Sequence, residues 1–284
     1  MRVMFMNAAE REQPPSSART ADPRTQNRSA FARLNDLLAP IEPGKPAINC
    51  AVGEPQHPVP AFAGPVFAQH IADLDPEAEV LVLNGTREGL FLAALAAARN
   101  ASPRAGRPAI LVPNPCYGAY SAGASASHCE TVFLSATARS GFLPDLDSLD
   151  DALLARTVAF YIASPANPQG SVASRDYLSR LVAMARKHDF MVFSDECYSE
   201  IYFGEKPTGI LEVAGPGYAN AVAFNSLSKR SNLPGLRVGF VAGDRTFLAR
   251  FLEYRNNAAP QVPMPAQAVA AAAHEYDPAL AVLG

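Results

Sequence analysis

The chain has 284 residues, of which 49% are hydrophobic, and this is enough to build one large buried core. Its 24 lysines and arginines nearly balance its 27 aspartates and glutamates, so the net charge of -3 gives no sign of a nucleic-acid-binding surface. Without an apolar run long enough to span a membrane, the composition favours a soluble cytoplasmic protein.

The first 28 residues are rich in Arg, Ser, Pro and Gln and show little apolar periodicity. They are typical of a disordered extension, or of a start codon chosen too far upstream. A targeting signal is the weaker reading, because no secretory apolar region is present and Glu10, Glu12 and Asp22 interrupt the acid-poor composition of a transit peptide. We take residues 29–78 as an N-terminal arm and a linking segment.

From residue 80 onward, apolar runs typical of strands alternate with helical patterns. The expected strands are 80–83, 109–112, 131–134, 158–163, 190–194, 221–225 and 237–242. The expected helices lie near 86–100, 117–126, 147–155, 174–188 and 244–257. This alternation predicts an α/β fold built on a parallel sheet.

The ends of the first two expected strands carry residues suited to ligand binding. In LVLNGTREG, Gly85 and Thr86 open a helix whose backbone N–H groups can cradle a phosphate. In NPCYGAY, Tyr117 offers a face on which a flat ring can stack. Each signal is weak alone, because Asn-Gly is an ordinary turn and a single tyrosine usually packs in the core.

Two later strand ends add polar groups. Asn167 sits in the turn SPANPQG, and Asp195 and Tyr198 follow the apolar run FMVFS. Open α/β sheets bind ligands at the carboxyl ends of their strands, so these side chains are candidates for one site. The ordinary alternatives are a helix N-cap for Asp195 and edge packing for Tyr198.

The segment SLSKRSNLPGLRVGF combines a lysine, small hydroxyl residues and an arginine. Lys229 is a candidate for a covalent bond to a carbonyl carbon. Ser226, Ser228 and Arg237 are candidates for binding a phosphate, because short hydroxyls and a planar guanidinium suit its oxygens. A solvated basic loop is the alternative, since Arg230 follows Lys229 directly.

Cysteine and histidine positions give no sign of a metal site. The four cysteines are scattered without metal-ligand spacing, and the five histidines form no paired motif. We therefore expect reduced thiols and no bound metal.

The order NGT, NPxY, SPxNPxG, SDExY and SxSKxxxLPGLRxG resembles the pyridoxal-phosphate-dependent aminotransferases of classes I and II, over about 31–274. The resemblance implies the three-layer α/β/α large domain of fold-type-I enzymes, with a seven-stranded mostly parallel sheet whose last strand is antiparallel. Within the family, the strings around Lys229 and Asp195 most resemble N-succinyldiaminopimelate aminotransferases.

The resemblance also implies a role for each matching residue. Lys229 would bind pyridoxal 5'-phosphate covalently and move the substrate proton, and Asp195 would pair with the ring nitrogen. The remaining cofactor contacts would come from Asn167 and Tyr198 at the ring oxygen, Tyr117 on the ring face, and Gly85, Thr86, Ser226 and Arg237 at the phosphate. Gly53 and Asn167 would contact the substrate. Arg87 and Arg230 are candidates for binding a succinyl carboxylate, and a solvated charge is the alternative for both.

The chain departs from the family pattern in two places. The segment between Gly53 and Gly85 is shorter than expected and no tyrosine precedes Tyr117, and no arginine or lysine follows Arg255 to clamp a substrate carboxylate. We therefore expect a cofactor-binding large domain at 79–258, only the start of a small-domain connection at 259–284, and a small domain that is largely missing.

The resemblance predicts a transaminase that moves an amino group between an amino acid and a 2-oxoacid. The expected pair is N-succinyl-LL-2,6-diaminopimelate with 2-oxoglutarate, in a cytoplasmic homodimer that binds neither nucleic acid nor membrane. Two alternatives stay open. One is other chemistry on the same cofactor, as a lyase, racemase or decarboxylase, and the other is a non-catalytic remnant or partner subunit.

Overall fold

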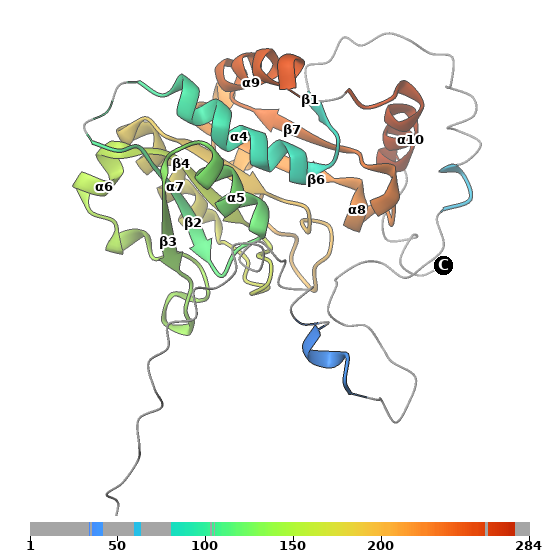
Figure 1. Ribbon diagram of the computed structural model, residues 1–284, viewed down its shortest axis with the longest axis horizontal. Coiled ribbons are helices and arrows are strands. Elements are labelled where there is room, and N and C mark those ends of the chain that lie inside the picture. Colours follow the sequence, from blue (N-terminus) through green and yellow to red (C-terminus); the bar gives the residue numbers. More distant parts are fainter. Residues whose placement is uncertain are drawn as a thin grey trace, which may run out of the picture. The chain divides into compact units, whose positions relative to one another are not determined.

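The computed structural model describes residues 34, 36–41, 60–63, 81–102, 104, 106–258 and 261–275 (Figure 1). The chain divides into two units, Met1–Gly53 and Glu54–Gly284. In the first unit, the described residues include a short helical stretch at 36–38 followed by a turn. The expectations for the extension 1–28 and for Gly53 lie outside the described residues.

The second unit is built on one sheet of seven strands in the order β1-β7-β6-β5-β4-β2-β3. Strands β2 to β6 run parallel to one another, whereas β7 is antiparallel to both of its neighbours, β6 and β1. This arrangement confirms the predicted mostly parallel sheet with an antiparallel last strand. The strands are β1 Leu81–Leu83, β2 Ala109–Asn114, β3 Glu130–Ser135, β4 Thr157–Ala163, β5 Met191–Asp195, β6 Ala221–Ser226 and β7 Gly239–Gly243.

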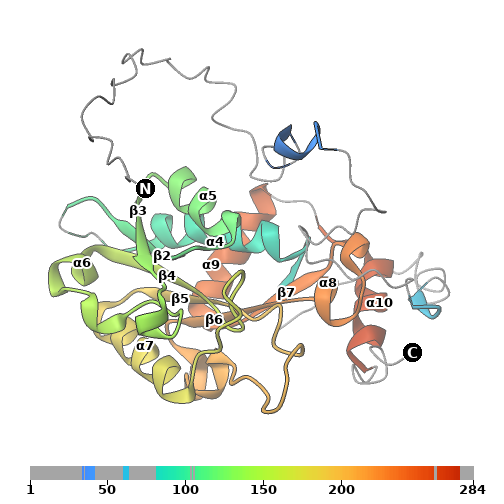
Figure 2. The same cartoon turned by 90° about the horizontal axis from the view of Figure 1, so that it is seen from below.

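Helices cover both faces of the sheet, giving the predicted three layers. Figure 2 shows α4 and α5 on one side of the sheet and α7 on the other. The α-helices are α4 Thr86–Asn100, α5 Gly118–Ala126, α6 Asp151–Arg156, α7 Arg175–His188, α8 Leu227–Arg230, α9 Arg245–Ala258 and α10 Met264–Glu275. Short 3-10 helices occur at Ala138–Ser140, Leu146–Ser148, Ile210–Glu212, Pro216–Tyr218 and Pro234–Leu236.

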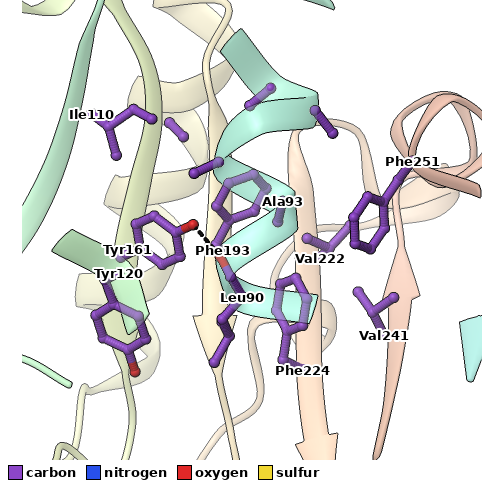
Figure 3. Packing of buried hydrophobic residues seen from close by; sticks show 14 of the residues in the cluster. Leu90, Ala93, Ile110, Tyr120, Tyr161, Phe193, Val222, Phe224, Val241 and Phe251 are labelled. Carbon is purple, nitrogen blue, oxygen red and sulfur yellow. Dashed lines mark hydrogen bonds between the residues drawn. The ribbon is translucent and has the colours of Figure 1, made fainter. Parts of the chain in front are cut away.

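The core on the α4 side is rich in aromatic side chains (Figure 3). Phe193 of β5 lies at its centre and contacts the rings of Tyr161, Phe224 and Phe247. All seven residues of β4 are buried, as expected for a parallel strand covered on both faces. A second apolar cluster packs α6 and α7 against the opposite face. The sheet is therefore held rigidly, and its edge can position side chains accurately.

No helix among the described residues is both long and apolar enough to cross a membrane.

Candidate functional site

The predicted site residues come together along the carboxyl edge of the parallel strands. In the sheet register, Asp195 at the end of β5 pairs with Ala163 of β4 and Phe224 of β6. Gly239, at the start of β7, pairs with both Leu83 and Ser226. Because β7 runs in the opposite direction, its first residue lies at the edge where β1 and β6 end. Residues far apart in sequence therefore meet at one edge.

Asp195 is a buried carboxylate whose two oxygens are both held. Asp195 is only 6% exposed, and its Oδ2 atom accepts a 2.6 Å hydrogen bond from the Tyr120 hydroxyl. The backbone N–H of Cys197 donates to Oδ1 at 3.2 Å. Burial raises the pKa of Asp195, and the hydrogen bonds from Tyr120 and Cys197 oppose that rise. The result is a fixed acceptor for a protonated ligand nitrogen.

Asn167 and Tyr198 meet beside this carboxylate. The Asn167 Nδ2 atom donates to the Tyr198 hydroxyl at 3.2 Å, joining the turn after β4 to the turn after β5. Burial raises the pKa of Tyr198, and the nearby charge of Asp195 adds to the rise. Tyr198 therefore stays a neutral phenol at neutral pH, able to donate or accept a hydrogen bond. The two residues form a pair, as expected for groups that share one ligand oxygen.

Tyr117 lies at the N-cap position of α5, where its ring is half-buried. The Nε atom of Arg87 donates to the Tyr117 hydroxyl at 2.7 Å, and the guanidinium carbon lies 5.8 Å from the ring centroid. An edge contact with Tyr120, at 5.7 Å between centroids, holds the ring from another side. Arg87 thus positions the aromatic face of Tyr117, in addition to any contact with a substrate.

Gly85 and Arg237 bring two parts of the predicted phosphate site together. Gly85 caps the N-terminus of α4 with φ 76°, and Arg237 adopts a left-handed conformation with φ 57°. A Cβ on Gly85 would lie 2.2 Å from Nη2 of Arg237. The missing side chain therefore lets the guanidinium reach the helix N-terminus, where backbone N–H groups and positive charge suit a phosphate.

Lys229 lies on the short helix α8, directly after β6. Ser226 caps this helix by accepting from the backbone N–H of Ser228 at 3.1 Å, and the two serine hydroxyls lie 3.0 Å apart. Burial and the charge of Asp195 raise the pKa of Cys197, and the positive charge of Lys229 acts against that rise. Lys229 therefore interacts electrostatically with Cys197, which lies two residues after Asp195.

Two residues at this edge, Tyr120 and Cys197, were missed by the sequence analysis. Tyr120 contacts Asp195 directly, and the thiol of Cys197 lies 3.2 Å from the hydroxyl of Thr86, linking β5 to α4. Tyr120 ends the same NPCYGAY string as Tyr117, and its spacing of three residues in a helix was the available signal.

Arg230, a candidate for binding a succinyl carboxylate, makes contacts within the protein instead. Its Nε atom donates to Glu200 at 2.7 Å, and its Nη1 atom donates to the carbonyl of Ala273 near the end of α10 at 2.7 Å. Its side chain is 11% exposed, so it is not a solvated charge. These contacts favour a structural role for Arg230 over the binding of a substrate carboxylate, because its donors already have acceptors.

Fold and site together describe an α/β protein whose candidate ligand-binding residues lie at the carboxyl edge of a parallel sheet. A family model described as "Aminotransferase class I and II" matches residues 59–281, so the chain belongs to that family. Enzymes of this family use pyridoxal phosphate. The residues present fit this group, because a buried carboxylate, a phenol–amide pair, a lysine and an arginine at a helix N-terminus suit its ring, aldehyde and phosphate.

Curated relatives share this sequence over part of their length. The chain is 37% identical to the "LL-diaminopimelate aminotransferase" of Syntrophobacter fumaroxidans over 186 residues, which are 65% of this chain and 46% of that protein. For two other curated relatives with the same name, the match to this chain covers 56% and 53% of the relative's own length. The chain therefore spans about half the length of the curated relatives it matches.

Solved structures share its fold. An aminotransferase from Neisseria meningitidis superposes with a TM-score of 0.77 at 32% identity, covering 89% of this chain and 72% of that one. A probable N-succinyldiaminopimelate aminotransferase from Thermus thermophilus gives a TM-score of 0.74 at 22% identity, covering 82% and 69%. At that identity, the second likeness supports the fold alone.

Proposed function

We propose that this protein binds pyridoxal 5'-phosphate and transfers an amino group between an amino acid and a 2-oxoacid. The observation that carries the proposal is the convergence of Asp195, the Asn167–Tyr198 pair and the Gly85–Arg237 contact at one edge of the sheet. These groups match the ring nitrogen, the ring oxygen and the phosphate of one ligand. Membership of the aminotransferase family supports the same reaction.

The cofactor, when bound, supplies an aldehyde carbon and a ring that accepts electrons from the substrate α-carbon. Lys229 would hold the cofactor through its aldehyde carbon, with loss of water, and its amine, when free, would carry the substrate α-proton. Asp195 would pair with the protonated ring nitrogen, and Tyr117 would pack on the ring. In this proposal the phosphate is held by the N-terminus of α4 at Gly85 and Thr86, and by Ser226 and Arg237.

For the substrates, we propose a diaminopimelate-type amino donor and 2-oxoglutarate, in lysine biosynthesis. The names of the curated relatives favour free LL-diaminopimelate over the N-succinyl form that the sequence motifs suggest. Gly53 and Asn167 are the proposed substrate contacts, and Arg87 is the candidate for the distal end of the donor. We further expect a cytoplasmic homodimer, which size-exclusion chromatography with light scattering tests.

The cofactor site is tested by the absorbance spectrum of the purified chain with pyridoxal phosphate, before and after borohydride treatment. A visible band that borohydride removes, and that is absent in Lys229→Ala, is the expected result. Arg230→Ala is a useful comparison, because it removes the neighbouring positive charge and leaves Lys229 in place. A folded wild-type protein without such a band would reject the proposal.

Substrate choice is tested by comparing LL-diaminopimelate with its N-succinyl derivative as donors. Arg87→Ala should lower kcat/KM for the preferred donor about tenfold and have a smaller effect on alanine, since a lost charge-assisted hydrogen bond costs at least this much. Equal losses for all donors would reject a substrate contact. Such losses would be explained by the hydrogen bond between Arg87 and Tyr117.

A second candidate function is other chemistry on the same cofactor. The residues around Lys229 and Asp195 support proton movement at the α-carbon, which lyase, racemase and decarboxylase reactions share, whereas the choice among them depends on contacts elsewhere. Product analysis without a 2-oxoacid distinguishes these reactions from transamination. A non-catalytic partner subunit would instead copurify with an intact aminotransferase and show no turnover alone.

A further inference from the structure

Among the described residues, Tyr120 donates a side-chain hydrogen bond to Asp195 from another element of the fold. It lies on α5, 75 residues away in sequence, and its hydroxyl reaches Oδ2 at 2.6 Å. The other carboxylate oxygen is held by the nearby backbone of Cys197. Rotation of the carboxylate about its χ2 torsion is therefore resisted at both oxygens, and the contact at Oδ2 depends on the side chain of Tyr120.

The Tyr120 ring is itself fixed by its neighbours. It stacks on Tyr161 with ring centroids 4.8 Å apart and planes 11° apart, and both side chains are fully buried. Tyr161 in turn donates from its hydroxyl to the carbonyl of Leu90 at 2.6 Å. Figure 3 shows the two rings side by side, with the Tyr161 hydroxyl directed to Leu90 of α4. Tyr120 thus reaches Asp195 from a rigid support.

We propose that Tyr120 is a positioning residue, which fixes the orientation of Asp195 and stabilises its charged carboxylate for pairing with the cofactor ring nitrogen. This inference rests on the proposed function in naming the ring nitrogen as the partner. Its first part, the hold on the carboxylate, concerns the protein without a cofactor. The two parts can therefore be tested separately.

The charges around Asp195 are consistent with this role. Burial and the charge of Asp195 raise the pKa of Tyr120 well above its usual range, so its hydroxyl remains a donor at any physiological pH. The other titratable groups that act here are Glu196, Cys197 and Tyr198 on the chain after β5, Cys116 before α5, and Lys229 on α8. Among those groups, Tyr120 donates to Asp195 from a separate element of the fold at 2.6 Å, and the side chain of Cys197 also contributes a hydrogen bond.

The first experiment uses the protein without cofactor and compares Tyr120→Phe with Tyr161→Phe. Each change removes one buried hydroxyl and one hydrogen bond from the same aromatic pair, but only the first bond ends on a carboxylate. The pKa of Asp195 is raised in the folded protein, so folding favours its protonated form. The stability that this gives at acidic pH is lost as pH rises through the folded pKa. Because the Tyr120 hydrogen bond opposes this rise, removing the hydroxyl raises the pKa of Asp195 further and extends the loss of stability to higher pH.

Urea unfolding across a pH series is the measurement. We expect the folding equilibrium constant of Tyr120→Phe, relative to Tyr161→Phe, to fall about tenfold between acidic and neutral pH. Parallel pH profiles for the two variants would overturn the proposed hold on the carboxylate, because a purely structural hydroxyl would lower stability equally at every pH.

The second experiment measures the affinity of each variant for pyridoxal phosphate by fluorescence or absorbance titration. Tyr120→Phe should bind about tenfold more weakly than wild type, and Tyr161→Phe within about threefold. Equal affinity of all three proteins would overturn the positioning role. If wild type fails to bind the cofactor, the proposed function fails, and the cofactor-free pH profiles still decide whether Tyr120 stabilises the carboxylate.

Discussion

Gly85 shows how one residue can join backbone shape to ligand binding. Its φ of 76° and ψ of 152° belong to a region that residues with a Cβ avoid. Its bare Cα also gives the guanidinium of Arg237 room against the start of α4. A side chain here would therefore disturb both the turn and the proposed phosphate contact.

Replacing Gly85 by alanine should weaken binding of pyridoxal phosphate at least about tenfold, because the new methyl group displaces Arg237 from the phosphate. The matched control is Gly106→Ala, where φ is 81° and nothing lies within 4 Å of the added Cβ. Both variants should lose about 1–3 kcal/mol of stability from backbone strain. Isothermal titration and urea unfolding measure the two effects, and equal affinities would contradict the contact.

The pH dependence of stability should be visible at a second residue, Glu196. It is buried beside Asp195, and its Oε1 atom accepts from the Ile210 backbone at 2.7 Å and from Ser194 at 2.9 Å. Burial raises the pKa of Glu196, against the effect of these two donors. Because the pKa of Glu196 is higher in the folded than in the unfolded protein, its titration stabilises the fold at pH values below the unfolded pKa. This stabilisation is lost as pH rises through the folded pKa.

Glu196→Gln removes the titration while keeping the shape of the side chain. The stability advantage of wild type over this variant should therefore shrink as pH rises from the ordinary carboxyl value of 4.5, by about 1.4 kcal/mol for each unit of pKa shift. Urea unfolding of the cofactor-free proteins measures it. A stability advantage of wild type that stays constant or grows with pH would contradict a raised pKa of Glu196 in the folded protein.

Among the elements, α4 and α9 are joined by a buried ion pair at the start of α4. Arg255 donates to Glu88 at 2.8 Å through Nε and at 3.2 Å through Nη2, and the two side chains are 8% and 18% exposed. Glu88 also accepts from the backbone of Asn84, just before Gly85. The pair therefore ties α9 to the turn that carries the proposed phosphate site.

Arg255→Met should destabilise the protein by about 3 kcal/mol, because it leaves the Glu88 carboxylate buried without its cation. The double variant Glu88→Gln, Arg255→Met should recover part of this loss. Arg175→Met is the matched control, since Arg175 pairs with Glu212 at 2.7 Å with side chains 56% and 50% exposed. It should cost less than about 1 kcal/mol. Equal losses at both sites would contradict the role of burial.

Most elements could be predicted from the sequence, and the exceptions have local causes. The helix α4 has the predicted bounds 86–100, because its apolar spacing and the Gly-Thr start agree. The helix expected at 147–155 divides into a 3-10 turn and α6, since Asp145 and Asp150 each cap a new start by accepting from a backbone N–H. Helices α8 and α10 were missed, the first because four residues carry no periodicity.

The candidate site was predictable where a motif marks a strand end, as for Asp195, Asn167 and Arg237. Contacts between elements were not predictable, because the pairing of Tyr120 with Asp195 or of Arg230 with α10 depends on packing across the sheet. The roles assigned to Lys229, Tyr198 and the other site residues stay predictions until the cofactor experiments are made.

At the scale of the molecule, the described sheet joins its earliest and latest strands. Leu81 of β1 pairs with Val241 of β7, so the first described strand lies at the sheet edge beside the last one. The other five strands run parallel to one another.

Because β1 pairs with β7, it cannot join the described sheet until β7 has been synthesised. At about 5–20 residues per second, the ribosome makes Arg237 roughly 8–30 seconds after Gly85. During that interval β1 has no partner strand in the described sheet, and its edge is available to other chains or chaperones. The proposed phosphate site is thus completed late in synthesis, because Arg237 is made long after Gly85.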